Sequence, residues 1–178
     1  MLKTILGLLL VAIAGFLGFI ALQPAEFSVK REALIAAPPQ AVYAQVDNFR
    51  NWQAWSPWAK LDPNAKATFE GPETGNGAMF SWAGNSEVGE GKMTIIESVP
   101  NDFVRMRLDF TQPMAATNET IFTFKPEGDG TRMTWEMTGH NNFLARIVCF
   151  FMDMDGMVGG QFEKGMANIA DVLKAKPG

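Results

Sequence analysis

Residues able to do acid–base or metal chemistry are few in this chain and lie far apart. Its 178 residues contain one histidine, His140, and one cysteine, Cys149. One residue of each type excludes the common zinc-binding ligand sets and any disulfide within the chain. The same scarcity excludes Ser–His–Asp and Cys–His catalysis unless His140 itself is the base. We therefore predict no metal site.

Glu97 and His140 are the two candidates for a catalytic acid or base. Glu97 shares the alternation phase of Met93 and Ile95, so we expect it to face the apolar side of its strand, where a carboxyl group could donate a proton. His140 ends the last predicted strand, where a histidine is more often a surface or capping residue. The glycine-rich stretch 71–77 lacks the Gly-Lys-Ser/Thr ending of a phosphate-binding loop, so it is interpreted as a turn and no cofactor is predicted.

The composition is that of a folded chain without affinity for nucleic acid. Hydrophobic residues make up 47% of the sequence and charged residues 19%, and the formal net charge is −4. Disordered chains are poorer in apolar residues and richer in charge. Because no basic surplus is available to neutralise a phosphate backbone, nucleic-acid binding is not expected.

The N-terminal segment is apolar enough to cross a membrane. Residues 5–22 carry no charged or strongly polar side chain, and a helix of this length spans about 27 Å, close to the hydrocarbon thickness of a bilayer. A cleaved signal peptide is the alternative, but the Ala-x-Ala site at 12–14 leaves too short a hydrophobic region before the cut. We predict a single-pass anchor in residues 1–23 and one domain in residues 24–178. Lys3 favours a cytoplasmic amino terminus and thus an extracytoplasmic domain.

From residue 27 to His140 the pattern is that of antiparallel strands separated by turns. Apolar residues from Val104 to Phe110 alternate with charged ones, and similar alternation recurs in the other segments. One apolar face and one polar face are typical of an antiparallel sheet covered on a single side. The predicted strands are 27–35, 67–70, 78–83, 88–98, 103–110, 118–125 and 131–139.

Helical signals flank this strand region on both sides. Pro38 and Pro39 favour the start of a short helix, since proline is tolerated in the first helical turn. After the last strand, Asn141 or Asn142 can cap a helix from residue 143 to about 154. Residues spaced by three or four then predict a long terminal helix, and glycines at 156, 159 and 160 are expected to break or bend the chain before it. The spaced residues are Val158, Phe162, Met166, Ile169 and Leu173.

This order of elements resembles the START-like, or SRPBCC, superfamily, in its polyketide cyclase/dehydrase and lipid transport branch. The resemblance covers about residues 26–175 and is strongest in 47–58, 75–82, 91–98 and 160–168. It implies an α+β helix-grip fold, in which a curved antiparallel sheet of about seven strands wraps around the long C-terminal helix and leaves an apolar cavity. Members of the superfamily bind lipids, sterols, polyketides or hormones, and some catalyse cyclisation or dehydration.

The apolar sheet face and the terminal helix could enclose a binding cavity. Gly156, Gly159, Gly160 and Gly165 remove side chains from the helix, and eleven methionines suit an adaptable lining. The alternative is that the same side chains fill a solid core. The cavity residues that we predict are Trp82, Met93, Ile95, Met106, Leu108, Phe122, Phe124, Met133, Trp135, Met137, Met157, Phe162 and Met166.

Three functions fit these patterns. The first is a membrane-tethered module that binds a hydrophobic small molecule or lipid, with residues 5–22 in the membrane. The second is a cyclase- or dehydratase-type enzyme that uses Glu97 or His140 on a hydrophobic substrate. The third is a solid-core interaction protein held at a membrane. The lack of catalytic groupings favours the first. The apolar segment 143–152 is interpreted as a cavity lid, a surface at the membrane interface or a buried first turn of the terminal helix.

Overall fold

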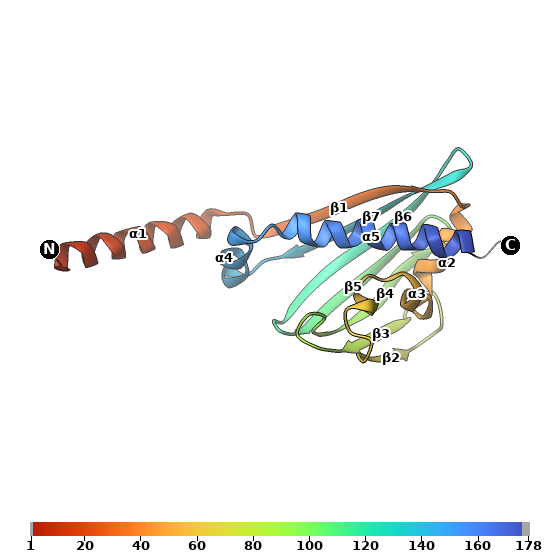
Figure 1. Cartoon of the computed structure of the whole chain (residues 1–178), viewed down its shortest axis with the longest axis horizontal. Coiled ribbons are helices and arrows are strands. Elements are labelled where there is room, and N and C mark those ends of the chain that lie inside the picture. Colours follow the sequence, from red (N-terminus) through yellow and green to blue (C-terminus); the bar gives the residue numbers. More distant parts are fainter. Residues whose placement is uncertain (1, 176–178) are drawn as a thin grey trace.

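Residues 2–175, which the computed structural model describes, contain seven antiparallel strands in one curved sheet (Figure 1). The strand order is β1-β7-β6-β5-β4-β3-β2, so the first strand pairs with the last. With the long C-terminal helix, this sheet confirms the predicted α+β helix-grip fold. The bounds are β1 (Glu26–Ile35), β2 (Lys66–Glu70), β3 (Met79–Ala83), β4 (Glu90–Val99), β5 (Phe103–Gln112), β6 (Ala116–Glu127) and β7 (Gly130–His140).

Alternation sets which face of each strand is buried. On β5, Val104 and Met106 are buried, whereas Arg107, the next residue along the strand, is exposed. On β7, Met133 and Trp135 are buried in the same way. A slip of one residue in pairing would turn these apolar side chains to water and bring the arginines inside, so the register is well determined.

A β-bulge breaks the alternation on β4. Ile95 pairs with Met106 and Glu97 pairs with Arg105, which leaves Ile96 without a partner on β5. The extra residue reverses the facing of the residues that follow it. Glu97 is exposed and lies 3.4 Å from the Arg105 guanidinium, so the expectation that Glu97 faces inward is wrong.

The helices begin where the sequence signals place them. Proline stands at the start of α2, and the side chain of Asn142 accepts a hydrogen bond from the Ala145 amide at the start of α4. Two single-turn 3-10 helices, η1 and η2, flank the short helix α3. The bounds are α1 (Leu2–Leu22), α2 (Pro39–Asp47), η1 (Phe49–Asn51), α3 (Trp52–Trp55), η2 (Trp58–Lys60), α4 (Phe143–Phe151) and α5 (Met154–Ala175).

The break between the two terminal helices lies before the glycines rather than at them. The chain turns at Met152 and Asp153, and the Asp153 side chain accepts a hydrogen bond from the Gly156 amide in the first turn of α5. α5 then continues without interruption through Gly159 and Gly160. The predicted break at these glycines is therefore wrong, because a side-chain cap at Asp153 starts the helix upstream of them.

Two of the helix glycines allow α5 to lie close to the sheet. A Cβ atom on Gly159 would lie 2.2 Å from the Arg31 guanidinium carbon, and one on Gly165 would lie 2.8 Å from the Trp135 ring. Arg31 holds the start of α5 by ion pairs to Asp155 at 2.8 Å and Glu163 at 3.0 Å. The hydrogen bond from Arg31 lowers the pKa of the Asp155 carboxyl. These two glycines thus permit close packing.

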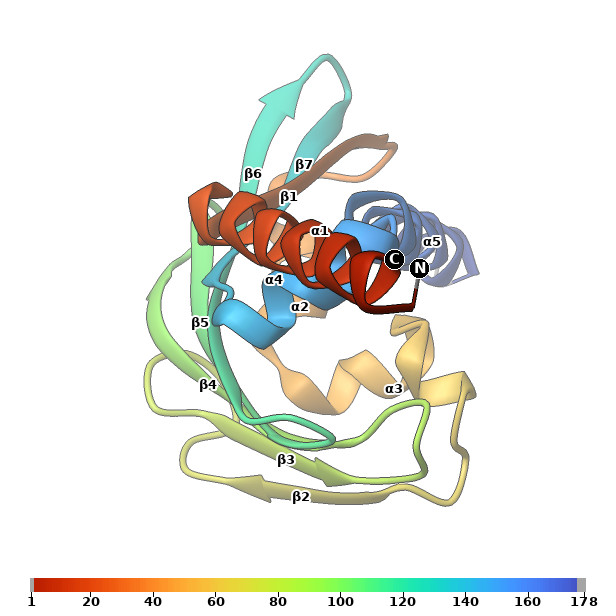
Figure 2. The ribbon, with the colours of Figure 1, turned by 90° about the vertical axis from the view of Figure 1, so that its left-hand side faces the viewer.

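The strand register gives the sheet two distinct ends. The α1 end is the end at which the chain leaves α1 and starts β1; Figure 2 views the sheet from this end. At the opposite end, which we call the α2 end, α2 packs against β5, β6 and β7. The pairs along the α1 end are Glu26–His140, Gly139–Asn118, Ala116–Phe110, Gln112–Glu90, Glu90–Ala83 and Ala83–Lys66.

α1 is exposed along nearly its whole length. Its 21 residues make a helix of about 31 Å. Of its side chains, Ile20 is buried by the rest of the protein. Among the described residues α1 is the one helix long and apolar enough to cross a membrane, a property that a signal sequence shares.

Substitution of Gly165 by alanine tests the close contact of α5 with the sheet. Trp135 cannot easily move, because its ring stacks on Phe162 at 4.1 Å and its indole N–H bonds to Thr120. We expect G165A to lower the free energy of unfolding by about 1–2 kcal/mol, since overpacking outweighs the gain in helix propensity. The measurement is urea denaturation of the full chain in detergent, followed by circular dichroism.

G160A is the matched control on the same helix. A Cβ atom there has nothing within 4 Å, so alanine should raise the free energy of unfolding by about 0.5–1 kcal/mol. Equal stability of the two variants would contradict a close contact at Gly165.

Candidate functional site

A cavity of about 340 Å³ lies at the α1 end of the sheet, on its concave side. This volume is at the low end of the range of about 300–1,000 Å³ typical of small-molecule sites. Its walls come from β2 to β7, from α3, η2 and the loop after them, and from the first turns of α5. Exposed lining residues in the β3–β4 and β5–β6 connections, Glu87 and Pro113 among them, place its mouth at that end.

Two aromatic rings form the sheet wall around a glycine. Trp82 and Phe110 both lie opposite Gly91 in the pairing of neighbouring strands, and their ring centroids are 5.7 Å apart. A Cβ atom on Gly91 would lie 2.6 Å from the Trp82 ring. The absence of a side chain at Gly91 therefore lets the Trp82 indole lie across β4 and form an apolar wall.

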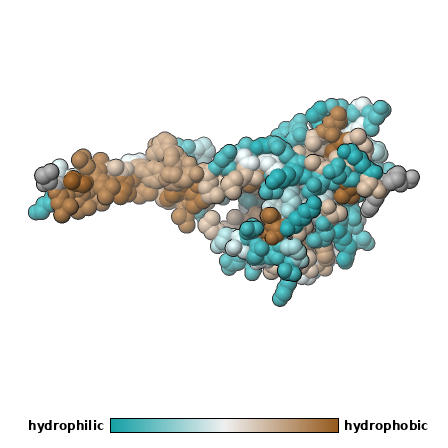
Figure 3. All heavy atoms as spheres, in the orientation of Figure 1, coloured by the Kyte–Doolittle hydropathy of each residue, from teal (hydrophilic) through white to brown (hydrophobic). Residues whose placement is uncertain are grey.

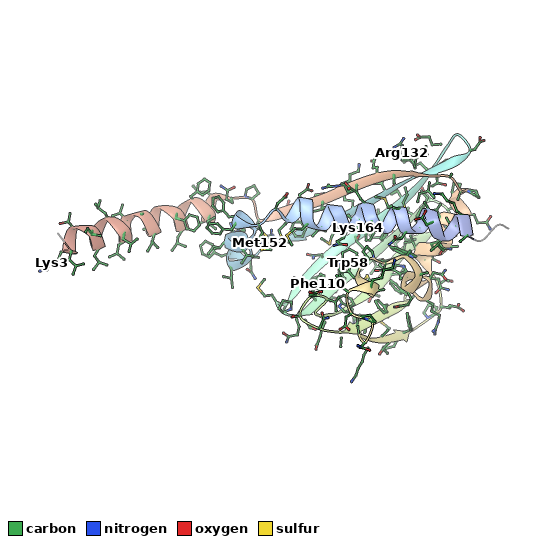
Figure 4. The ribbon with its side chains drawn as sticks, viewed as in Figure 1. Lys3, Trp58, Phe110, Arg132, Met152 and Lys164 are labelled. Atoms are coloured by element: carbon green, nitrogen blue, oxygen red, sulfur yellow. The ribbon has the colours of Figure 1, made fainter. Side chains whose placement is uncertain are left out.

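The tryptophan-rich segment covers the cavity from the opposite side. Trp55 is completely buried in the core, whereas Trp52 and Trp58 line the cavity. The centroid of the Trp58 ring lies 5.9 Å from that of Trp135 and 6.4 Å from that of Phe162. Figure 4 labels Trp58 and Phe110, two of the side chains on opposing walls. Aromatic surface on two sides suits a flat or chain-like apolar ligand.

Trp58 also differs from the other tryptophans in the hydrogen bonding of its indole N–H. Trp52, Trp55 and Trp82 each donate the indole N–H to a backbone carbonyl, and Trp135 donates to Thr120. Within residues 2–175, the Trp58 indole N–H has no acceptor. Unlike the Nε atoms of Arg105 and Arg146, which are buried without a partner, this nitrogen is open to solvent. Trp58 can therefore donate a hydrogen bond to an oxygen of a bound molecule.

The charged residues of the lining lie at its rim. Asp62 is half-buried, and its carboxylate accepts hydrogen bonds from the amides of Asn64 and Asn85, which ties the loop after η2 to the β3–β4 turn. Lys66 and Glu87 are exposed. Among residues 2–175 no three His, Cys, Asp or Glu side chains are grouped to hold a metal ion. The lining thus offers shape and apolar surface rather than an acid–base pair.

The predicted cavity residues divide by their position along the strands. Six of them line the cavity: Trp82, Met93, Leu108, Trp135, Met137 and Phe162. Six others are buried in the core outside its lining: Ile95, Met106, Phe122, Phe124, Met133 and Met166. Met157 is 55% exposed on the outer side of α5. The strand residues of the two sets share the concave face, but those of the core set lie mostly nearer the α2 end. Phe162 and Met166 belong to α5.

The two candidate catalytic residues lie outside the cavity. Glu97 is on the outer face of the sheet beside Arg105, and His140 is exposed at the end of β7, where it pairs with Glu26. A partly buried chain of polar side chains exists elsewhere: the hydroxyl of Tyr43 lies 2.8 Å from that of Ser98, which donates to Asp47 at 2.6 Å. Burial raises the pKa of the Tyr43 phenol. This chain joins α2 to β4 and does not line the cavity.

Several lining residues were absent from the sequence prediction. Phe80 and Phe110 share the alternation phase of Trp82 and Leu108, so the same pattern could have identified them. Trp58 follows Trp52 and Trp55 at intervals of three residues, but this spacing does not show which of them lines a cavity. The loop residues around Asp62 follow no periodic pattern. Their place in the site depends on how the irregular segment folds back over the sheet.

Solved structures with this fold are known from several bacteria. Protein MLL2253 from Mesorhizobium loti has 15% identity and a TM-score of 0.62, over 85% of this chain and 99% of that chain. The Aha1 dimer from Colwellia psychrerythraea has 14% identity and a TM-score of 0.60, over 85% and 99%. CalU16 from Micromonospora echinospora has 14% identity and a TM-score of 0.55, over 86% and 76%. Similarity at these identities shows the fold alone. No curated protein matches the chain significantly.

A sequence model of one family matches residues 26–174 and is described as "Polyketide cyclase / dehydrase and lipid transport". The match begins at the first residue of β1 and ends one residue before the last described residue of α5. It therefore includes every wall of the cavity and excludes α1. The chain belongs to the polyketide cyclase / dehydrase and lipid transport family.

Proposed function

We propose that this chain is a membrane-tethered module that binds a hydrophobic small molecule or lipid in the cavity between the sheet and α5. Residues 1–23 would form the anchor and residues 24–178 the binding domain. The observation that carries the proposal is the 340 Å³ cavity with aromatic and methionine walls, in a chain whose α1 is apolar and uncovered by the domain. Lys3, in the first turn of α1, favours a cytoplasmic amino terminus and a domain on the opposite side.

The lining also indicates the chemistry of the ligand. The volume suits one acyl chain or a small polycyclic compound, and the walls contribute little charge. At the rim, the Trp58 indole N–H is available to a single oxygen atom. A ligand with an apolar body and one carbonyl, hydroxyl or carboxylate group would satisfy both features.

Ala59 provides a test of the cavity, because its side chain lines it from η2. We expect A59F to fill part of the volume and to reduce ligand labelling about fivefold or more, as overfilled sites reject their ligands. The full chain is placed in phosphatidylcholine nanodiscs with hexadecanoic acid that carries a mid-chain diazirine. After photolysis, mass spectrometry maps the adducts.

Ala54 gives the matched control, since it is exposed on α3 and does not line the cavity. A54F should label like the unaltered chain, and adducts on α1 report ligand in the bilayer equally in all variants. Adducts confined to α1 and α4 in the unaltered chain would contradict binding in the cavity.

Replacement of Trp58 by phenylalanine tests the proposed hydrogen bond to the ligand. W58F keeps an aromatic wall and removes the N–H, so unlabelled hexadecanoic acid should compete for the cavity about 2–10-fold less well, the usual effect of one hydrogen bond. Competition by hexadecane, which has no oxygen, should change by less than about twofold. An equal loss for both competitors would show that Trp58 acts through packing alone.

A further inference from the structure

α4 is an apolar helix that the rest of the protein leaves largely uncovered. Arg146 is its one charged residue, and none of its residues is buried. Leu144 is 59% exposed and Phe151 is 72% exposed, and Val148 lies one turn from Leu144 on the same face. An exposed apolar patch of this kind marks an interaction surface.

Within the described part of the chain, the helix that α4 packs against is α1, near its C-terminal end. The centroid of the Phe16 ring lies 5.6 Å from that of Phe150 and 5.9 Å from that of Phe151. The centroid of the Phe19 ring lies 5.9 Å from that of Phe150. Phe16 precedes Leu22, the last residue of α1, by six residues and Phe19 precedes it by three, which correspond to about 9 and 4.5 Å along the helix axis. α4 therefore lies beside the last two turns of α1, at a depth of about 5–10 Å if α1 crosses a bilayer, which is the depth typical of interfacial helices.

The one charged side chain of α4, Arg146, binds the C-terminal end of α1. Arg146 donates hydrogen bonds to the backbone carbonyl oxygens of Ala21 and Gln23, each at 3.1 Å. These are carbonyls at the C-terminal end of a helix, where a cation is favourable. The guanidinium is thus engaged at the junction, and the remaining surface of α4 is apolar. Figure 3 shows this hydrophobic surface continuing from α1 onto the adjoining part of the domain.

We propose that α4 lies in the interfacial layer of the same bilayer that α1 crosses, and that the cavity receives its ligand directly from that layer. The inference rests on the proposed function. It adds that a lipid bilayer covers the exposed surface of α4. It also adds that the ligand is an amphiphile dissolved in that membrane. Continuity with α1 and the matching depth argue for a bilayer over a partner protein.

The position of the cavity mouth agrees with this arrangement. α5 starts three residues after α4 ends, and Val158, which lines the cavity, lies four residues into α5, about 6 Å along its axis. The β5–β6 connection reaches the same end of the domain in Figure 1, with Pro113 in the lining and Met114 exposed beside it. An acyl chain leaving the interface would therefore travel a short distance to reach the cavity.

Spin labels test the depth of α4 in the full chain in phosphatidylcholine vesicles. In a C149S background, single cysteines replace Leu144 on α4, Leu9 in mid-α1 and Asn76 in an exposed turn. We expect collisions with oxygen to exceed those with a water-soluble nickel complex at Leu9 and at Leu144, with the greater depth at Leu9, whereas Asn76 should show the reverse.

The three positions separate the possible failures. A Leu144 label as accessible to nickel as the Asn76 label, with Leu9 still immersed, would overturn the interfacial position of α4 and leave the anchor intact. A Leu9 label accessible to nickel would overturn the anchor itself.

Charges on α4 test delivery of the ligand from the membrane. L144E/V148E should lower cavity labelling by diazirine hexadecanoic acid, which stays in the vesicle bilayer, by about fivefold. Labelling by a diazirine octanoic acid, which reaches the cavity through water, should be unchanged. L34E, which places one glutamate on an exposed leucine near the α2 end, is the control for a surface charge away from α4. Equal effects on the two acids, or none on either, would overturn delivery from the bilayer.

Discussion

The packing of α5 against Trp135 is the contact on which the interior of this protein depends. Phe162 stacks on the indole with an interplanar angle of 9°, and Gly165 removes the side chain that would hold the helix away. Phe122 and Trp55 pack against the same ring. Trp135 thus joins the terminal helix, the sheet and the tryptophan-rich segment in one aromatic cluster, and the rest of the core is arranged around it.

The cavity follows from the way in which α5 lies on the sheet. The helix makes its main strand contacts with β1, while Ile35, Phe124 and Met133 fill the space near the α2 end. At the α1 end, the concave face of β3, β4 and β5 is covered by the short segments α3 and η2 and the loop after them. Short irregular segments cannot present a continuous row of side chains, so space is left between them and the aromatic wall at Trp82. The fold therefore places its hollow at one end of the sheet.

Much of the fold could be predicted because it depends on periodic signals. Alternation identified all seven strands, and Asn142 and Pro39 marked the starts of helices. The anchor-like helix was predictable from its uninterrupted apolar residues. Alternation alone does not show where along a strand a side chain lies. This explains why Met93 and Leu108 line the cavity while Met133 and Phe124, on the same face, are in the solid core.

Other features had no periodic signal. The bulge at Ile96 reverses the facing of Glu97, and no glycine or proline marks it. The glycines of α5 suggested a broken helix or an open space, yet Gly165 serves a close contact with a residue 30 positions earlier in the chain. Contacts of this kind depend on tertiary geometry that spacing does not encode. Trp58 is a further example, because its role follows from the acceptor that its indole N–H lacks among the described residues.

The link between α1 and β1 has a consequence for how such a protein could deliver cargo. Three residues, Gln23 to Ala25, separate the two elements, and a fully extended stretch of that length reaches about 10 Å. Arg146 further restrains this link by donating a hydrogen bond to the backbone carbonyl of Gln23. With α1 in a bilayer, the domain could not swing across to an opposing membrane.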